Sequence, residues 1–105
     1  MAILVDRCFS VVYEVAAEDE LKGLRPFDRR RVVDEVDEML TTHPDRPGRR
    51  KKLLTGVSSP WDGIGPVWQV RVGDFRVFYD VDRAARQVII RAVRRKGTRT
   101  TKEIL

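Results

Sequence analysis

Two arginines flank a tight-turn sequence in the second half of the chain. Arg71 and Arg76 stand on either side of Gly73-Asp74. Alternating apolar residues predict strands over residues 67–72 and 75–81, joined by a two-residue turn in which glycine supplies the positive φ. The two arginines are then neighbours on one face, where guanidinium groups could bind a phosphate in pairs. The alternative is that surface acids pair with each arginine, or that water alone solvates it.

More cations surround the hairpin in the sequence. Arg49-Arg50-Lys51-Lys52 precedes it, and a basic tail over residues 94–105 follows the last predicted strand. Residues 1–45 carry a net charge of −5, whereas residues 46–105 carry +10. This division indicates a surface that faces a polyanion, and nucleic acid is the most common polyanion in the cytosol. A well-solvated basic surface without a ligand is the alternative.

The cysteine, histidine and hydropathy content excludes several classes of protein. The single cysteine, Cys8, excludes an internal disulfide and a zinc site built from thiolates. The single histidine, His43, excludes a histidine-rich metal site, and we interpret it as a helix C-terminal residue. No apolar run approaches the roughly 20 residues of a membrane-spanning helix. We therefore expect a cytoplasmic protein with no membrane partner, no metal and no small-molecule cofactor.

The predicted elements place the two arginines on one sheet. We expect a single α+β domain over residues 1–105. Its elements are a strand over 9–15, a helical hairpin over 17–24 and 26–42, and strands over 67–72, 75–81 and 87–93. A short strand near Leu53 would give the antiparallel sheet four strands rather than three. The helices cover its apolar face, and the face with Arg71, Arg76 and Phe78 stays open to water.

The hairpin resembles that of a known group of proteins. Residues 68–80, WQVRVGDFRVFYD, look like the central hairpin of the RelE/ParE toxin superfamily of type II toxin–antitoxin systems. The chain length, the opening strand with its helical hairpin, and Lys51-Lys52-Leu53 ahead of the hairpin fit the same superfamily. The resemblance covers roughly residues 9–96 and implies a fold similar to RelE and to small microbial ribonucleases.

The resemblance implies two alternative activities. RelE-like members cleave mRNA in the ribosomal A site without a metal, by attack of a 2′-OH on the adjacent phosphate. ParE-like members inhibit DNA gyrase and are not nucleases. In both cases a cognate antitoxin protein neutralises the toxin, and for a RelE-like member mRNA and the ribosome are further partners. We favour the RelE-like activity, with gyrase inhibition or a catalytically inactive RNA- or antitoxin-binding homologue as alternatives.

The resemblance also assigns roles to individual residues. Arg76 maps onto the arginine that binds phosphate and stabilises the transition state, and Arg71 would assist it. The other candidates are cations around the hairpin and one aromatic residue on its open face. We expect Lys52 and Arg95 in the catalytic group, and Lys51, Arg50, Arg94, Lys96, Arg99 and Phe78 in contact with RNA.

The sequence departs from the RelE-like pattern in two places. Some RelE-like members have lysines at the positions of Val67 and Gln69, and many have a tyrosine or histidine in or just after the last strand, where this tail has neither. Arginine is a poor proton shuttle because it stays protonated in proteins. The remaining candidates for proton transfer are Lys51, Lys52 and Lys96. Catalysis would then be weak, use ribosomal groups, or be absent.

Overall fold

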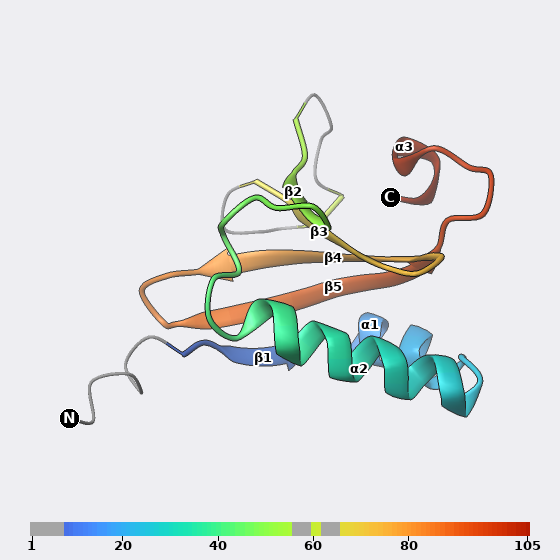
Figure 1. The fold of residues 1–105 in the computed structure, drawn as a ribbon, viewed down its shortest axis with the longest axis horizontal. Coiled ribbons are helices and arrows are strands. Elements are labelled where there is room, and N and C mark those ends of the chain that lie inside the picture. Colours follow the sequence, from blue (N-terminus) through green and yellow to red (C-terminus); the bar gives the residue numbers. More distant parts are fainter. Residues whose placement is uncertain (1–7, 56–59, 62–65) are drawn as a thin grey trace.

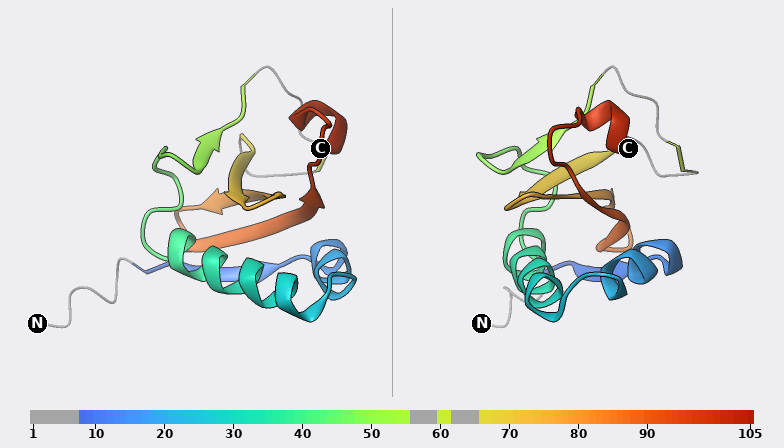
Figure 2. Two further views of the ribbon diagram at one scale, coloured as in Figure 1. Left: turned by 45° about the vertical axis from the view of Figure 1, so that its right-hand side comes forward. Right: turned by 90° about the vertical axis from the view of Figure 1, so that its right-hand side faces the viewer.

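A five-stranded sheet organises the chain in the computed structural model, which describes residues 8–55, 60–61 and 66–105. Its strands, in the spatial order β1-β5-β4-β3-β2, are β1 (Ser10–Tyr13), β2 (Lys51–Leu53), β3 (Trp68–Val72), β4 (Phe75–Asp82) and β5 (Gln87–Arg95). The helices are α1 (Val15–Lys22), α2 (Pro26–Leu40) and α3 (Thr101–Ile104). Helices α1 and α2 lie on one side of the sheet, and α3 lies on the other (Figures 1 and 2).

The long helix α2 forms where the apolar pattern predicts it. Pro26 occupies its first turn, where the missing N–H costs no hydrogen bond. Val32, Val36 and Leu40 repeat every four residues and are fully buried. This stripe packs with Leu21 of α1 against the apolar face of the sheet. The main core therefore lies between the helical hairpin and the central strands.

The β3–β4 hairpin has the register that the sequence predicts. Arg71 lies directly opposite Arg76, and Val72 lies opposite Phe75. Gly73 has a φ of 57°, which side chains with a Cβ rarely adopt. A Cβ at this position would also lie 2.8 Å from Nη1 of Arg31 on α2. The turn thus needs glycine for its backbone conformation and is crowded by α2.

The α+β class is confirmed, and the sheet is larger than expected. β2 pairs antiparallel with β3, which adds the short strand expected near Leu53. β1 pairs parallel with β5, so the first strand extends the sheet at its other edge. A parallel pair requires a long connection, which the intervening elements provide. Among the described helices, none combines the length and apolar character needed to cross a bilayer.

The sheet face opposite α1 and α2 is only partly open to water. Phe78 has no exposed surface and packs in a second core cluster with Val67, Ala92 and Ile104 of α3. The ring of Trp61 lies 6.3 Å from that of Phe78. The expectation that Phe78 lies on an open face is therefore wrong. The reason is that the basic tail folds back over this face, and its apolar end packs against Phe78.

Candidate anion-binding site

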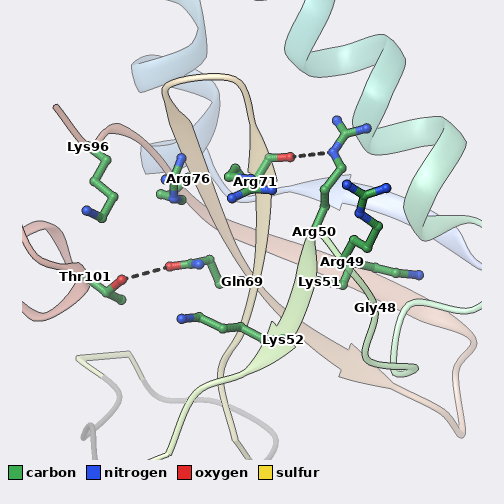
Figure 3. A pocket seen from close by; sticks show the side chains of 10 residues that line it. All are labelled: Gly48, Arg49, Arg50, Lys51, Lys52, Gln69, Arg71, Arg76, Lys96 and Thr101. Carbon is green, nitrogen blue, oxygen red and sulfur yellow. Dashed lines mark hydrogen bonds between the residues drawn. The ribbon is translucent and has the colours of Figure 1, made fainter.

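A basic pocket of about 200 Å³ opens on the sheet face opposite α2, beside the β3–β4 hairpin (Figure 3). Its lining residues come from β2, the segment before it, the hairpin and the tail. They are Gly48, Arg49, Arg50, Lys51, Lys52, Gln69, Arg71, Arg76, Lys96 and Thr101. Seven of these ten are lysine or arginine, and none is acidic. The pocket therefore has the charge of an anion-binding site.

Arg71 and Arg76 stand at the centre of the pocket. Nη1 of Arg76 donates to the main-chain oxygens of Gly73 at 3.1 Å and Phe75 at 3.0 Å, which fixes the guanidinium group at the turn. Burial lowers the pKa of Arg76 from its ordinary value, and the neighbouring charge of Arg71 lowers it further. Within the described residues, no carboxylate pairs with either guanidinium group. The nearby charge of Asp74 partly opposes this lowering of the Arg76 pKa, without forming an ion pair with it.

Four cations of the pocket keep their side chains free. Within the described part of the chain, the charged groups of Arg49, Lys52, Arg71 and Lys96 have no hydrogen-bond or ion-pair partner. Unpaired cations that converge repel each other, and an anion between them relieves that repulsion. These four residues are therefore the strongest candidates for direct contact with a bound phosphate.

Arg50 is held at the rim of the pocket by helix α2. Its Nε donates to the main-chain oxygen of Arg71 at 3.1 Å, and its Nη2 pairs with Glu35. Glu35 also accepts a hydrogen bond from Arg31 at 2.9 Å. The Arg31 hydrogen bond and the contact with Arg50 hold the pKa of Glu35 below its usual value, against an opposing effect of burial. Arg50 thus lines the pocket while its guanidinium group is paired with Glu35 of α2.

Lys51 forms part of the pocket wall, but its ammonium group faces the end of α2. Nζ donates to the main-chain oxygens of Met39 at 3.1 Å and His43 at 2.7 Å. Burial lowers the pKa of Lys51, and the nearby charge of Arg46 contributes. The carbonyl groups at a helix C-terminus lack partners within the helix, so a lysine placed there completes the helix end. In this arrangement Lys51 positions β2 and does not point at a ligand.

The basic tail contributes only one cation to the pocket. Arg94 pairs with Glu20 of α1 at 2.8 Å and donates to the main-chain oxygens of Ile104 and Leu105. Arg94 therefore joins α1 to the end of the chain and lies outside the pocket lining. The functional role expected for Arg94 is not supported by this position.

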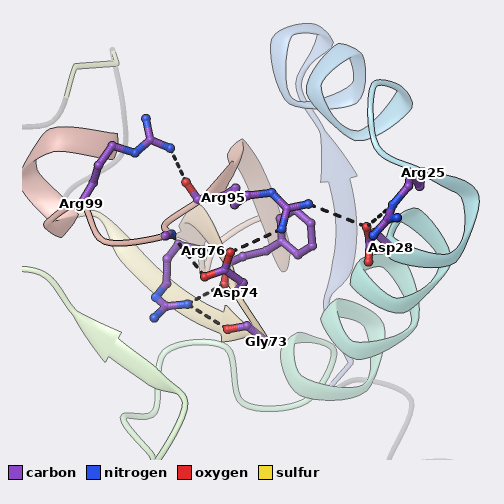
Figure 4. A network of polar contacts seen from close by, with 9 residues as sticks. Arg25, Asp28, Gly73, Asp74, Arg76, Arg95 and Arg99 are labelled. Carbon is purple, nitrogen blue, oxygen red and sulfur yellow. Dashed lines mark hydrogen bonds and ion pairs between the residues drawn. The ribbon is translucent and has the colours of Figure 1, made fainter.

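Arg95 and Arg99 are also absent from the pocket lining. Both belong to a network of polar contacts beside the hairpin (Figure 4). The guanidinium carbon of Arg95 is 4.6 Å from the centre of the Phe75 ring, and its nitrogens pair with Asp74 at 3.4 Å and Asp28 at 3.8 Å. Arg99 donates to the main-chain oxygen of Arg95. The sequence alone could not show that Lys96 lines the pocket while Arg95 and Arg99 do not. The reason is that the side chains at and after the end of β5 point to different sides.

Asp74 holds Lys96 in place beside the hairpin. Its main-chain oxygen accepts from the Lys96 N–H at 2.9 Å, and its Oδ1 accepts from the Gly97 N–H at 3.2 Å. Gly97 has a φ of 56°, so the chain reverses there and returns along the sheet. The turn sequence Gly73-Asp74 therefore orders both the hairpin arginines and the lysine opposite them.

Gln69 and Thr101 are pocket residues to which the sequence analysis gave no role, and Gln69 is named there only as a departure from the RelE-like pattern. Two signals could have found them. Gln69 shares the face of Arg71 by the two-residue period of a strand. Thr101 follows Thr100, which forms a capping box with Glu103, a pattern that predicts a helix start in the tail. Among the described residues, no cluster of three or more His, Cys, Asp or Glu side chains could hold a metal ion.

The sequence and the fold agree on the family of the chain. Residues 11–99 match the family described as "ParE toxin of type II toxin-antitoxin system, parDE". The chain belongs to this ParE toxin family. It is thus a toxin of the wider RelE/ParE superfamily, as the hairpin resemblance predicts. No curated protein matches the chain in sequence.

Solved structures similar to this ParE-family chain are RelE toxins. The archaeal RelE–RelB complex from Pyrococcus horikoshii OT3 has a TM-score of 0.66 and 21% identity, covering 87% of this chain and 98% of its own. The RelBE2 toxin–antitoxin complex from Mycobacterium tuberculosis has a TM-score of 0.63 and 24% identity, covering 84% and 98%. The isolated E. coli RelE toxin has a TM-score of 0.61 and 16% identity, covering 89% and 88%. At these identities, the likeness shows a shared fold.

Proposed function

We propose that this ParE-family toxin acts as a RelE-like endoribonuclease, cleaving mRNA on the ribosome and so inhibiting translation. The observation that supports it most directly is the basic pocket, where Arg71 and Arg76 face each other and no lining residue is acidic. RNA offers a phosphate at every nucleotide, and cations are the groups that bind it. The cytoplasm, where mRNA is translated, would then be the site of action.

The proposed reaction is a transesterification within one RNA strand. The 2′-oxygen loses its proton and bonds to the adjacent phosphorus, while the bond from phosphorus to the 5′-oxygen breaks. The products are a 2′,3′-cyclic phosphate and a 5′-hydroxyl, which takes up one proton. Negative charge builds on the phosphoryl oxygens in the transition state, and preorganised donors stabilise it strongly. Arg76 and Arg71 supply those donors.

Proton transfer falls to lysines in this proposal. Lys52 and Lys96 line the pocket with free ammonium groups, whereas the Lys51 ammonium is engaged by the end of α2. We assign one of the two free lysines, as the neutral amine, to accept the 2′ proton, and the other, as the ammonium, to donate a proton to the leaving oxygen. Arg50 and Arg49 would contact the neighbouring backbone phosphates.

The proposed partner is a cognate antitoxin. Two of the similar structures are complexes of a RelE toxin with its antitoxin. A neutralising antitoxin would have to cover or block the basic pocket, and an acidic segment suits that purpose. The neighbouring reading frame is the place to look for it.

Inhibition of DNA gyrase is the second candidate function. It is favoured by the match to the ParE family and by the chemistry of the pocket. None of the ten pocket residues is a histidine, tyrosine, aspartate or glutamate, the side chains that most often move protons in nucleases. A gyrase inhibitor would need the basic surface only for binding.

Expression of the toxin in growing cells separates the two candidates. Mapping of mRNA 5′ ends should reveal new ends phased with codons, carrying 5′-hydroxyl groups, within minutes of induction. Plasmid supercoiling should stay unchanged over the same period. Loss of supercoiling and DNA damage with intact mRNA would reject the nuclease and support gyrase inhibition.

A further inference from the structure

Gln69 is the one pocket residue that carries a neutral amide. It lies on β3, only 5% of its surface is exposed, and it faces the same pocket as the seven cations. Thr101 donates its hydroxyl proton to Oε1 of Gln69 at 3.3 Å (Figure 3). This bond spans from the tail to the sheet and turns Oε1 of the amide towards Thr101. The Nε2 group of Gln69 is left as a donor without an acceptor among the described residues.

The surroundings of that amide contain donors and few acceptors. Lysine and arginine side chains donate hydrogen bonds and cannot accept them. The main-chain oxygens nearest the turn are also occupied: Arg50 uses that of Arg71, and Arg76 uses those of Gly73 and Phe75. A base that enters this pocket therefore meets N–H groups on most sides.

We infer that Gln69, oriented by Thr101, is a specificity-determining residue that selects bases with a carbonyl group at the recognition edge. Uracil O4 and guanine O6 would accept from Nε2 of Gln69. Cytosine and adenine present an amino group at the same place. The lysine and arginine side chains of the described lining cannot accept its hydrogen bonds, and it would lose its hydration. The inference rests on the proposed function, since it assumes that RNA enters the basic pocket.

The cations around Gln69 cannot provide this selectivity. Contacts to phosphate position a nucleic acid but carry no sequence information, whereas contacts to base edges do. Changing a phosphate-binding residue such as Lys52 should therefore weaken the binding of all RNAs to the same extent. Changing Gln69 should instead alter the order of their affinities. This difference separates the inference from a general electrostatic effect.

Two RNAs whose bases differ in the tested group, and in the N3 atom beside it, provide the experiment. We would measure the binding of uncleavable 2′-O-methyl oligouridylate and oligocytidylate of equal length by fluorescence anisotropy. Both are pyrimidine strands of equal charge, and they differ at position 4 by a carbonyl or an amino group. The wild-type toxin should bind the uridine strand roughly three- to tenfold more tightly, the range of a net hydrogen bond.

Variants of Gln69 and Thr101 should lower this ratio to different extents. Gln69→Glu replaces the donor by an acceptor and should reverse the ranking in favour of the cytidine strand. Thr101→Val frees the amide to rotate and should bring the ratio close to one. Lys52→Ala should lower both affinities and leave the ratio unchanged. Each variant would be checked for an unchanged circular dichroism spectrum and thermal unfolding.

The outcomes distinguish this inference from the proposed function. Equal binding of both strands by the wild-type toxin, or a Gln69→Glu variant that keeps the uridine preference, would overturn base selection by Gln69 and leave RNA binding intact. Failure to bind either strand would contradict the RNA-binding proposal and the inference with it.

Discussion

Arg71 and Arg76 are directly opposite residues in the β3–β4 pair, and neither guanidinium group forms an ion pair with a carboxylate of the described residues. Like charges in such a position destabilise a sheet by a few tenths of a kcal/mol up to about 1 kcal/mol. A bound phosphate would convert that repulsion into two favourable contacts. This relationship links the turn sequence Gly73-Asp74 to the proposed function, because the turn sets the register that brings the arginines together.

Arg76→Ala should abolish growth inhibition in cells. The variant removes the donor nearest the turn, and loss of one such donor typically slows a reaction by roughly 10²- to 10³-fold. Arg76→Lys should retain part of the activity, because it keeps the charge without the fork of donors. The measurement is colony formation after induction, together with the yield of 5′-hydroxyl mRNA ends.

The control for this prediction is a second arginine outside the pocket. Arg83, which is 77% exposed and pairs with Asp45 at 2.6 Å, can be changed to alanine without touching the lining residues. Arg83→Ala should leave toxicity intact, and antitoxin binding should survive in both variants. A folded Arg76→Ala protein that still stops growth would disprove the role given to Arg76.

Binding of single-stranded RNA should weaken steeply as salt concentration rises. Each phosphate neutralised in a single strand adds about 0.7 to the slope of log affinity against log salt concentration. Lys52→Ala should lower that slope by roughly 0.7, because it removes one free cation from the pocket. Lys22→Ala, which alters a lysine on α1 that pairs with Glu18 at 3.6 Å, should leave the slope unchanged. A flat response to salt in the wild-type toxin would contradict the electrostatic argument.

The sheet and its hairpin could be predicted because local patterns specify them. Apolar residues alternate through β3 and β4, and the Gly73-Asp74 turn joins the strands without a register shift. Together they place Arg71 opposite Arg76 before any tertiary contact is known. The stripe on α2 fixes its buried face in the same way.

The partners of long cations could not be predicted from the same patterns. Lys51 and Lys52 are adjacent in one strand, yet the Lys51 ammonium binds the end of α2 while Lys52 stays free in the pocket. Adjacent side chains point to opposite faces, but which face holds the helix end depends on tertiary packing. Tertiary packing also decides that Lys96 lines the pocket and Arg94 does not, because Glu20 of α1 forms an ion pair with Arg94 only.

Phe78→Ala should destabilise the toxin because Phe78 is fully buried beneath α3. Removing a buried phenylalanine ring typically costs about 3–5 kcal/mol in the free energy of unfolding. Phe27→Ala is a matched control, since Phe27 is 77% exposed and its loss should cost less than about 0.5 kcal/mol. Urea unfolding of both variants measures the difference. Equal stability of the two variants would contradict the placement of α3 over Phe78.

Glu35→Gln should lower stability at neutral pH and not at acidic pH. Because Arg31 and Arg50 favour the ionised carboxylate, the pKa of Glu35 is lower in the folded chain than in the unfolded chain, where glutamate titrates near about 4.3. The stabilisation is complete above that value and disappears as the pH falls through the folded pKa. Because the ion pairs of Glu35 are partly exposed to water, their stabilisation of the fold is about 1 kcal/mol or less.

Unfolding at pH 7 and pH 3 tests the Glu35 prediction. The gap between wild type and Glu35→Gln should be present at pH 7 and smaller at pH 3. Glu38→Gln, on an exposed position of the same helix, should show no such gap at either pH. A gap of equal size at both values would mean that the charge of Glu35 is not what the variant removes.

Gly73→Ala should destabilise the hairpin and weaken RNA binding together. An alanine at a φ of 57° costs roughly 1–2 kcal/mol, and its Cβ would displace the Arg31 guanidinium group from its present position. Gly48→Ala is the matched control, because a Cβ there would meet nothing within 4 Å although Gly48 also lines the pocket. The thermal unfolding temperature and the RNA affinity should both fall for Gly73→Ala and stay near the wild-type values for Gly48→Ala. If Gly73→Ala unfolds earlier but binds RNA as tightly as wild type, the turn supports the fold without setting the spacing of Arg71 and Arg76.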